Sequence, residues 1–493
     1  MKQEVSSEIQ SIARTLHKAG YSAYLVGGCV RDMLLGRAPK DWDVATNATP
    51  EEIQKLFPES VYENEFGTVG VKTGSEDPTR KIIEVTTFRK DGTYTDKRHP
   101  DAVVFAKTIE EDLARRDFTV NALAFRIVES GKWKVESREL IDPYSGKSDL
   151  EKKIIRAVGD PSARFNEDAL RLMRAVRFAA QLGFMIEEKT AAAIKQHAGL
   201  LEMVSKERIR DELAKLIMNE HAADGIRQLE QLGLLKYVIP ELCEGVGMAQ
   251  NLHHIYSVFE HNVRALQYTA EKNYTFPVRL GALLHDVGKP RTKRGEGKYA
   301  TFYNHEVVGA RMTAKILDRL RFSKEVVEYV THLVRWHLFY YNVGEVSAAG
   351  VRRFLVHIGV ETVDDILRIR EADRIGSGVP KAFPYRLRHL KFMIEKVRRD
   401  PVHPKMLALR GDDVMQLLGI EASPRIGHLL AILLEEVLDD PKKNDHEKLA
   451  TRLKELNQWS DSELVLLRKK AEARKEEFEA GVEKEMKQRH AVS

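Results

Sequence analysis

The sequence predicts an α+β protein, in which a small mixed α/β head is followed by an all-helical neck, body and tail. Two observations lead to this fold class. Alternating, β-branched strand patterns occur almost only in the first 145 residues, and amphipathic helical patterns fill most of the remainder. The length of 493 residues allows roughly three domains. A content of 43% hydrophobic and 31% charged residues excludes a wholly disordered chain and a collagen-like one.

We expect four segments, with soft boundaries: a head at residues 1–145, a neck at 146–245, a helical body that contains most of the histidines at 246–385, and a helical tail at 386–493. In the head, strands are predicted at residues 22–28, 41–45, 68–73 and 81–88, and a short helix at 30–35. Helix starts are predicted at Thr49-Pro50, and at Thr108, where Glu111 completes a capping box. In the neck, the clearest helical patterns are at residues 166–182 and 205–218.

The charge balance and the cysteine content limit the class of protein. There are 79 Lys and Arg against 74 Asp and Glu, a formal charge of +5 that is compatible with a nucleic-acid partner without establishing one. No apolar run approaches the ~20 residues that a membrane helix needs, and the N-terminal stretch carries acids and lacks an apolar signal core. Cys29 and Cys243 are too few for a disulfide framework or a thiolate zinc site. We therefore expect a cytoplasmic protein without membrane contact.

The first candidate site is the acidic pair Asp41 and Asp43, which follows a glycine-rich turn. In a strand, residues two apart point to the same face, so both carboxylates could converge on Mg²⁺, which prefers carboxylate and phosphate oxygens. Gly28 would let the backbone approach a triphosphate, and Arg31 is a candidate phosphate neighbour. Glu84 is a candidate third carboxylate. Alone, each feature is as typical of a solvated strand or a simple turn; their closeness favours catalysis.

Two further clusters are typical of nucleotide recognition. Arg116 suits a phosphate, Asp117 could accept a hydrogen bond from a ribose hydroxyl, and Asn121 could support either role. On a helix, Asp168 and Arg171 would present an acceptor beside a donor, which matches the pairing edges of C and A and not those of G and U. The alternatives stay open: a charge cluster at a helix end for the first group, and an ordinary salt-bridged helix face, with Glu167 pairing to Arg171, for the second.

The order of these motifs resembles the class II tRNA nucleotidyltransferases, the CCA-adding enzymes, and the related bacterial poly(A) polymerases of the polymerase-β superfamily. The resemblance rests on VGGCVRD with DWD, RRDFTVNA, the turn at residues 142–146 and EDALRLMRAVRF, and it covers roughly residues 20–180. It implies a nucleotidyltransferase head, a neck that reads the incoming base, and a body and tail that hold tRNA. Carried over by motif, it gives Asp41 and Asp43 as catalytic Mg²⁺ ligands and the following as nucleotide contacts: Gly28, Arg31, Arg116, Asp117, Asn121, Glu167, Asp168, Arg171 and Arg174.

Residues 89–100 resemble the flexible loop with which this family moves from C to A addition. The loop is full length here, which argues for an enzyme that can incorporate A. A plain connection between two strands is the alternative.

A second metal site is predicted in the body. An adjacent His285-Asp286 follows an apolar run, and the order of this pair among the other histidines resembles the HD family of metal-dependent phosphohydrolases. The candidate ligands are His261, His285, Asp286, His305, His337 and Asp373. Such a set suits Mg, Mn or Ni. Any one of these histidines is more often a hydrogen-bonded core residue.

The function that the sequence predicts is template-independent addition of C and A to the 3′ end of tRNA from CTP and ATP. The HD site would add phosphatase or cyclic phosphodiesterase activity for repair of 3′ ends. We expect tRNA, ATP and CTP as partners and no obligate protein partner. The alternatives are an enzyme that adds A only, a poly(A) polymerase, and an HD phosphohydrolase whose head only docks RNA.

Overall fold

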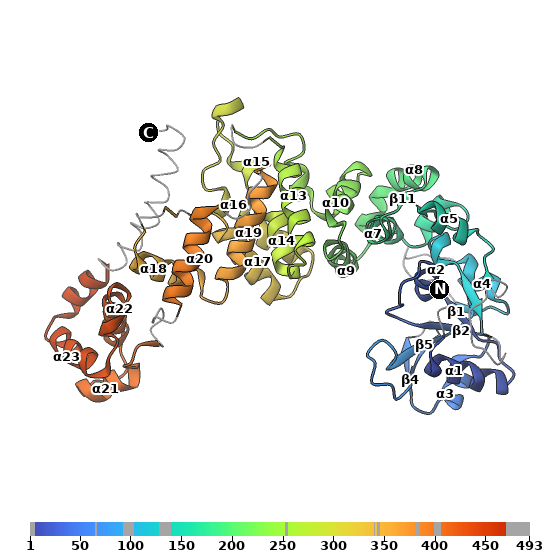
Figure 1. The fold of residues 1–493 in the computed structure, drawn as a ribbon, viewed down its shortest axis with the longest axis horizontal. Helices are drawn as coiled ribbons and strands as arrows, with labels where there is room; N and C mark the ends of the chain where they lie inside the picture. The colour runs from blue at the N-terminus through green and yellow to red at the C-terminus, as the bar shows by residue number, and fades with distance from the viewer. Residues whose placement is uncertain are drawn as a thin grey trace. The chain divides into compact units, whose positions relative to one another are not determined.

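The computed structural model describes residues 5–64, 67–91, 103–127, 140–251, 255–339, 341–342, 346–379, 384–398 and 406–469. The chain divides into two compact units (Figure 1). Unit 1 comprises residues 1–243 and 319–322, and unit 2 comprises residues 244–318 and 323–493. Each unit is described by itself.

Unit 1 begins with a mixed sheet whose strand order is β3-β4-β5-β2-β1-β8-β9. The strands are β1 (Tyr24–Val26), β2 (Asp43–Thr46), β3 (Ser60–Asn64), β4 (Thr68–Lys72), β5 (Ile82–Thr87), β8 (Ala124–Arg126) and β9 (Leu140–Ile141). A separate ribbon pairs β6 (Arg89–Asp91) with β7 (Val103–Phe105). The pairing of β2 with β5 is parallel and puts Asp43 opposite Glu84. The centre of the sheet therefore carries two carboxylates side by side.

Helices at the ends of these strands fix the head. They are α1 (Ser7–Lys18), α2 (Gly28–Leu34), α3 (Pro50–Leu56) and α4 (Ile109–Ala114). Thr49 caps α3 in a full capping box with Glu52, and Thr108 accepts a hydrogen bond from the backbone of Glu111, as the sequence predicts. α3 lies against β3, β4 and β5, whereas α2 contacts β1 and the short 3₁₀ turn η1 (Thr119–Asn121). This arrangement brings the turn before α2 next to η1.

The neck continues unit 1 as a series of helices with one small parallel strand pair, β10 (Ile154–Ile155) and β11 (Met185–Ile186). The helices are α5 (Gly146–Lys152), α6 (Pro161–Glu167), α7 (Arg171–Leu182), α8 (Glu188–His197), η3 (Ala198–Met203), α9 (Lys206–Ile217), α10 (Ala222–Gln231), α11 (Leu235–Val238) and α12 (Pro240–Cys243). α7 packs against α9 and α10. The prediction of a helix at residues 205–218 is confirmed by α9.

Two local predictions need correction. The predicted strand at residues 41–45 begins at Asp43, so Asp41 lies in the segment before β2. The predicted single helix at 166–182 is wrong, because the chain leaves α6 at Asp168 in an extended conformation (φ −135°, ψ 105°) and starts α7 at Arg171. Both differences place an acidic side chain on irregular backbone.

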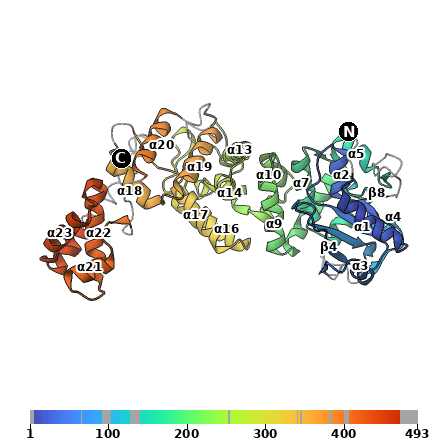
Figure 2. The same ribbon diagram turned by 60° about the horizontal axis from the view of Figure 1, so that its bottom comes forward.

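Unit 2 is helical in the residues that the structure describes. Its first helices are α13 (Val258–Glu271), α14 (Phe276–Leu284), α15 (Lys289–Thr292), α16 (His305–Arg319), α17 (Lys324–Trp336) and α19 (Val363–Gly376), with η4 (Gly297–Tyr299) between α15 and α16. α13 packs on α14 and α19, and α14 also packs on α17 (Figure 2). The buried apolar side chains continue through α18 (Ala348–Ile358), α20 (Tyr385–Val397), α21 (Gly411–Leu418), α22 (Pro424–Asp439) and α23 (His446–Asn457). The short turn η6 (Pro441–Lys443) follows α22 and buries no side chain.

The mixed sheet followed by helices confirms the predicted α+β fold class. Among the described residues, no helix combines the length and the apolar character that crossing a membrane requires.

Candidate functional site

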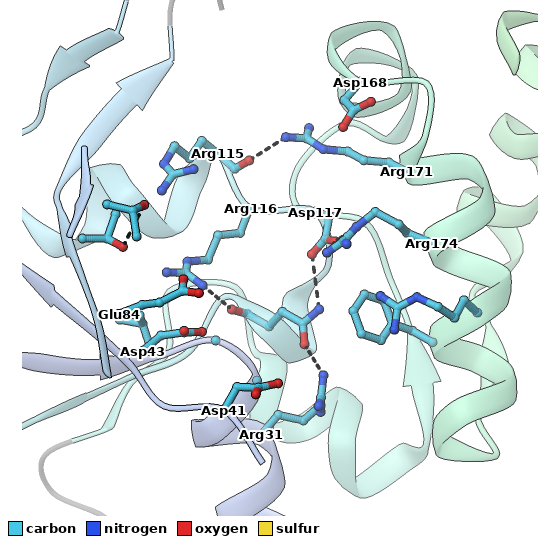
Figure 3. Close-up of a pocket in the computed structure, with 18 of the residues that line it drawn as sticks. Arg31, Asp41, Asp43, Glu84, Arg115, Arg116, Asp117, Asp168, Arg171 and Arg174 are labelled. Carbon is cyan, nitrogen blue, oxygen red and sulfur yellow. Dashed lines mark hydrogen bonds and ion pairs between the residues drawn. The ribbon is translucent and has the colours of Figure 1, made fainter. Parts of the chain in front are cut away.

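A pocket of about 530 Å³ opens in unit 1 between the sheet of the head and helix α7 of the neck. Three carboxylates line its head side: Asp41, Asp43 and Glu84 (Figure 3). Asp43 and Glu84 are register partners on β2 and β5, and Asp41 reaches the same wall from the segment before β2. The sequence prediction that Asp41 and Asp43 converge therefore holds, although one strand does not carry both.

The carboxylate wall concentrates negative charge around Asp43, which is half-buried, whereas Asp41 and Glu84 are exposed. Burial raises the pKa of Asp43 above its ordinary value; the charge of Arg116 opposes this rise and that of Asp41 adds to it. Neighbouring carboxylates repel one another when both are ionised, and a bound divalent cation relieves this repulsion. Carboxylate oxygens are also the ligands that hard divalent cations prefer. These residues therefore fit Mg²⁺, the ion expected from the sequence.

The glycine turn before α2 holds the backbone close to this wall. Gly27 has φ 72°, and a Cβ added there would lie 2.7 Å from a guanidinium nitrogen of Arg116 and 3.6 Å from a carboxylate oxygen of Asp43. Gly28, the first residue of α2, also lines the pocket. A side chain at position 27 would therefore displace Arg116, and the left-handed backbone would be strained as well.

A chain of hydrogen bonds crosses the pocket from head to neck (Figure 3). Arg31 donates to the side-chain oxygen of Asn121 (2.8 Å), and the amide nitrogen of Asn121 donates to Asp117 (3.3 Å). Asp117 in turn accepts from Arg174 of α7, with the closest nitrogen at 2.6 Å. Four of the nine predicted nucleotide contacts thus form one connected network that fixes the orientation of Arg174.

Asp117 is the anchor of this network. Its side chain is 9% exposed, and one of its oxygens also accepts from the backbone amide of Phe118 (2.8 Å). Burial would raise the pKa of Asp117, but the charges of Arg174 and Arg171 and the hydrogen bonds outweigh it and lower the pKa to about 2. The carboxylate is therefore ionised at neutral pH and holds the arginines of the neck.

The break between α6 and α7 places Asp168 on the pocket wall. One carboxylate oxygen accepts from the backbone amide of Leu170 (3.0 Å), and the other pairs with Arg208 of α9 (2.8 Å). The predicted helical i,i+3 pair of Asp168 with Arg171 is therefore corrected, because Asp168 lies on extended backbone. Asp168, Arg171 and Arg174 nevertheless line the same side of the pocket, opposite the carboxylate wall (Figure 3).

Arg171 is held by three acceptors. It pairs with Glu167 (2.6 Å), as the i,i+4 spacing predicts, and donates to the backbone carbonyls of Arg164 (3.2 Å) and Arg115 (2.9 Å). Glu167 also pairs with Arg164 (2.5 Å) and is not among the lining residues. Arg171 is thus a fixed donor on the pocket wall, and Glu167 lies behind it.

Residues that the sequence analysis missed support the wall. Glu212 of α9, 3% exposed, accepts from Arg177 (2.5 Å) and lies 3.8 Å from Arg174. The guanidinium carbon of Arg177 lies 3.9 Å from the ring centre of Phe178, which also lines the pocket. The sequence did carry a signal for these residues, because Arg208 and Glu212 are charged residues one turn apart on an amphipathic helix. Their partners, Asp168 and Arg177, are distant in sequence and could not be inferred from this spacing.

In the head, the missed residue is Asp112, which is 1% exposed and pairs with Arg115 (2.7 Å) and Arg116 (3.2 Å). It therefore fixes both arginines of the second motif. The loop expected at residues 89–100 begins in β6, and its residues 92–100 lie outside the described part of the chain.

In unit 2, the structure brings all six predicted metal ligands together. His261, His285, Asp286 and Asp373 form one group whose ligand atoms lie within 4.8 Å of one another. Asp286, His305 and His337 form a second group, so that Asp286 is common to both. The ligands come from α13, from the ends of α14 and α17, from the start of α16 and from α19.

The orientation of the histidine rings fits a metal centre. In His285, His305 and His337 the Nδ1 atom lies 2.7 Å from a backbone carbonyl oxygen three residues earlier. Such a bond fixes the proton on Nδ1 and leaves Nε2 as a ligand atom, the usual support of a metal-bound histidine. The Nε2 atoms of His305 and His337 then lie 3.2 Å and 3.7 Å from one oxygen of Asp286. The residues therefore fit one or two divalent ions.

The charges around this cluster keep the acids ionised. Burial would raise the pKa of Asp286, but the charges of Lys289 and His285 hold it well below its usual range. Burial holds the pKa of His337 well below its usual value. Lys289, 2.6 Å from Asp286, is in turn bonded to the buried Gln250 (2.7 Å).

Close packing requires a glycine at position 288, shortly after His285-Asp286. A Cβ added to Gly288 would lie 2.3 Å from the backbone oxygen of His305 and 2.6 Å from the backbone nitrogen of Gly309. Only glycine lets the chain just before α15 (Lys289–Thr292) approach the start of α16 this closely, and this approach brings His305 near His285 and Asp286.

Three family models match successive parts of the chain. The poly A polymerase head domain matches residues 23–156, the probable RNA and SrmB-binding site of polymerase A matches 183–245, and the HD domain matches 258–364. The first of these spans the sheet with its carboxylates, and the third spans five of the six ligands of the unit 2 cluster.

Relatives are similar over nearly the whole chain. An A-adding tRNA nucleotidyltransferase of Deinococcus radiodurans is 36% identical over 427 residues, which cover 84% of this chain and 91% of that protein. A CCA-adding enzyme of Lactiplantibacillus plantarum is 32% identical over 450 residues, covering 89% and 93%. Among solved structures, the Bacillus stearothermophilus CCA-adding enzyme in complex with CTP has a TM-score of 0.66 and 28% identity, covering 92% of this chain and 98% of that one.

The fold, the carboxylate pocket and these similarities together define a nucleotidyltransferase that also carries an HD domain. The chain belongs to the class II tRNA nucleotidyltransferases, the family of the CCA-adding enzymes. The resemblance expected from the motifs is thus confirmed.

Proposed function

We propose that this enzyme adds C and A, without a nucleic-acid template, to the 3′ end of tRNA, using CTP and ATP. The observation that carries the proposal is the pocket itself, in which a wall of three carboxylates faces a wall formed by Asp168, Arg171 and Arg174. The first wall suits the transfer of a nucleotidyl group and the second suits recognition of a base. The head (1–145) would then do the chemistry, the neck (146–245) would choose the nucleotide, and the body (246–385) and tail (386–493) would hold the RNA.

Asp41 and Asp43, with Glu84 beside them, are the proposed ligands of Mg²⁺. Bound there, the ion would activate the 3′ hydroxyl and neutralise the leaving pyrophosphate. In the reaction the 3′ oxygen forms a bond to the α-phosphorus, the bond to the bridging oxygen breaks, and pyrophosphate and the hydroxyl proton are released. Arg116 points toward the same wall and would bind the triphosphate, as would the backbone at Gly28 and the side chain of Arg31.

The base would be read by Asp168 and Arg171. A carboxylate beside a guanidinium offers an acceptor next to a donor, which matches the amino group and ring nitrogen of C and of A. Arg208 and Glu167 hold these two groups in place from behind. Asp117, bonded to Arg174, would position that arginine and keep acceptor capacity for a ribose hydroxyl.

The test uses three tRNAs that end before CCA, after C and after CC, each with Mg²⁺ and one labelled nucleotide at a time. Stepwise addition of C, C and A with refusal of UTP and GTP supports the full CCA reaction. Addition of A to the CC-ended tRNA alone makes the chain an A-adding enzyme, as one relative is named. Long A tails would make it a poly(A) polymerase. No extension of any tRNA would contradict the proposal and leave the head as an RNA-docking module.

A second activity is proposed for the HD cluster, because the described residues supply both ligand groups and the histidine orientations that metal binding needs. We infer a divalent metal (Mg, Mn or Ni) at this site and hydrolysis of phosphate monoesters or 2′,3′-cyclic phosphates, which would clean damaged tRNA ends before nucleotide addition. The double variant His285→Ala/Asp286→Ala should lose bound metal and phosphohydrolase activity and keep nucleotide addition. Loss of both activities would mean that the HD domain is structural.

A further inference from the structure

The outer face of helix α20 (Tyr385–Val397) in unit 2 has an unusual composition for a solvated surface. The inner face is ordinary: Leu387, Leu390, Ile394 and Val397 are buried in the apolar core of the unit. The exposed side chains of α20 are four cations, two large rings and one acid, Glu395. This α20 face consists of Tyr385, Arg386, Arg388, Lys391, Phe392 and Lys396.

The α20 face holds most of the charge excess of the chain. Within α20 there are four basic residues and one acid, Glu395, a net charge of +3 in 13 residues. The whole chain has only +5, from 79 basic and 74 acidic residues. Among the described residues, Arg388 and Lys396 have no carboxylate within ion-pair distance, whereas many arginines elsewhere in unit 2 are paired, such as Arg353 with Glu435. This positive charge is therefore available to an anionic partner.

The rings form a row along the same helix. Tyr385 is 62% and Phe392 58% exposed, although both are large enough to be buried in a core. The ring of His389 lies between them, with centroid distances of 6.0 Å and 6.2 Å. A 2.5 Å hydrogen bond between Nδ1 of His389 and the hydroxyl of the buried Tyr341 holds this middle ring in place. The row is thus a partly fixed platform of π surfaces, beside cations at every turn.

We propose that the α20 face binds RNA at unpaired bases, which stack on Tyr385 and Phe392 while the phosphates contact Arg386, Arg388, Lys391 and Lys396. Aromatic platforms flanked by cations are the usual means of holding unpaired nucleotides, since every base has a π face and every linkage a negative charge. The inference rests on the proposed function insofar as the RNA is a tRNA, whose unpaired loop bases would be the ligand. It adds a binding surface in unit 2, separate from the pocket of the head.

An anionic membrane or an acidic protein would also be attracted by the charge. RNA fits better, because the exposed apolar groups on this face are flat rings rather than aliphatic chains: the leucines and the isoleucine of α20 all point into the core. A membrane-binding helix would instead expose a broad aliphatic face.

The test uses the full chain and two variants, Tyr385→Ala/Phe392→Ala and Arg388→Gln/Lys396→Gln. The matched control is Tyr299→Ala, which removes an exposed tyrosine (75%) elsewhere in unit 2. Dissociation constants are measured at several salt concentrations for a tRNA ending in CC and for a blunt RNA duplex with the same 3′ end. All five changed positions are at the surface, so unchanged melting temperatures are expected and are checked first.

The ring variant should weaken tRNA binding by roughly tenfold or more, because each base stack contributes about 1–3 kcal/mol, and should leave duplex binding unchanged. The charge variant should weaken binding of both RNAs and lower the salt slope by about 1–2. The control should match the wild type. Equal tRNA affinity of the ring variant and the wild type would overturn the proposal. It would also be overturned if the variants bound tRNA normally and lost only binding to anionic vesicles or association with a second copy of the chain, which are measured alongside.

These outcomes are separate from those of the nucleotide-addition test. The nucleotide-addition test is made on the wild-type chain, and α20 contributes no residue to the pocket of unit 1, so its result does not depend on the ring variant. A chain that bound tRNA through the α20 face but added no nucleotide would contradict the proposed function and leave this inference standing.

Discussion

Glu212 offers the sharpest test of how the neck holds the nucleotide pocket. Its carboxylate is 3% exposed and lies 2.5 Å from Arg177 and 3.8 Å from Arg174. Arg174 is also bonded to Asp117, so Glu212 is the second of two anions that balance two closely spaced guanidinium groups. We predict that Glu212→Gln destabilises unit 1 and displaces the arginines without removing any group that touches substrate.

The size of the effect follows from the geometry. Glutamine keeps one oxygen acceptor but removes the charge, so the loss should be that of a charged hydrogen bond, about 1.5–3 kcal/mol. Glu212→Ala leaves Arg177 buried without this partner and should cost roughly 3–5 kcal/mol. For a unit of this size, each kcal/mol lowers the melting temperature by about 2–4 °C, so Glu212→Gln should melt roughly 3–12 °C below the wild type.

The matched control is Glu207→Gln, an exposed glutamate on the same helix. Its melting temperature should equal that of the wild type, because exposed single charges contribute little. In steady-state addition of A to a CC-ended tRNA, Glu212→Gln should raise the KM for ATP and largely keep kcat, since the carboxylate wall is untouched. Equal melting temperatures and equal KM values for the two variants would refute the reasoning.

Three more changes test other parts of the pocket. Gly27→Ala should cut nucleotide addition in rate assays, because its Cβ would lie 2.7 Å from Arg116 on a left-handed backbone; a rate equal to the wild type would contradict this. Asp117 has a pKa lowered to about 2 from 3.8, so it stabilises the fold by about 2 kcal/mol above pH 4, and this contribution is lost as the pH falls toward 2. The stability difference between the wild type and Asp117→Asn, followed by thermal unfolding, should therefore shrink on acidification; a difference that stayed constant with pH would be the contrary result. Arg208→Ala frees Asp168 from its 2.8 Å ion pair and should increase misincorporation of GTP and UTP relative to ATP, measured by single-nucleotide extension; unchanged selectivity would show that Arg208 does not position Asp168.

Much of the carboxylate wall could be predicted from the sequence, because its residues are close together in local motifs. Asp41 and Asp43 are two residues apart, and the strand pattern around Glu84 already put it in the head. What the sequence could not give is that β5 pairs in parallel with β2 and sets Glu84 opposite Asp43. Strand order depends on contacts between distant segments, and one strand by itself does not specify its neighbours.

The wall formed by Asp168, Arg171 and Arg174 was predicted to lie on one continuous helix, and this local structure is wrong. Residues 166–182 have a continuous helical pattern, yet the chain breaks at Asp168. Tertiary contacts decide this: the freed carboxylate is satisfied by the amide of Leu170 and by Arg208, some forty residues away in sequence. Local propensity is a weak constraint where such contacts compete with it.

In unit 2 the sequence order of histidines and aspartates was enough to predict six residues that the structure brings together. The supporting hydrogen bonds from Nδ1 to backbone carbonyls could not be predicted, since they require each histidine to lie at or beside a helix end. Neither could the close approach at Gly288, which depends on how the chain before α15 packs against the start of α16.

The central claim is that the carboxylate wall of unit 1 is where nucleotidyl transfer occurs. The most direct measurement compares the wild type with Asp43→Asn in the addition of labelled A to a CC-ended tRNA with Mg²⁺ and ATP, with tRNA binding measured alongside. The account predicts that the variant binds tRNA normally and loses roughly a hundredfold or more in rate, since even residues behind a metal ligand affect activity by about 10–100-fold. A variant that adds A at the wild-type rate would contradict the account.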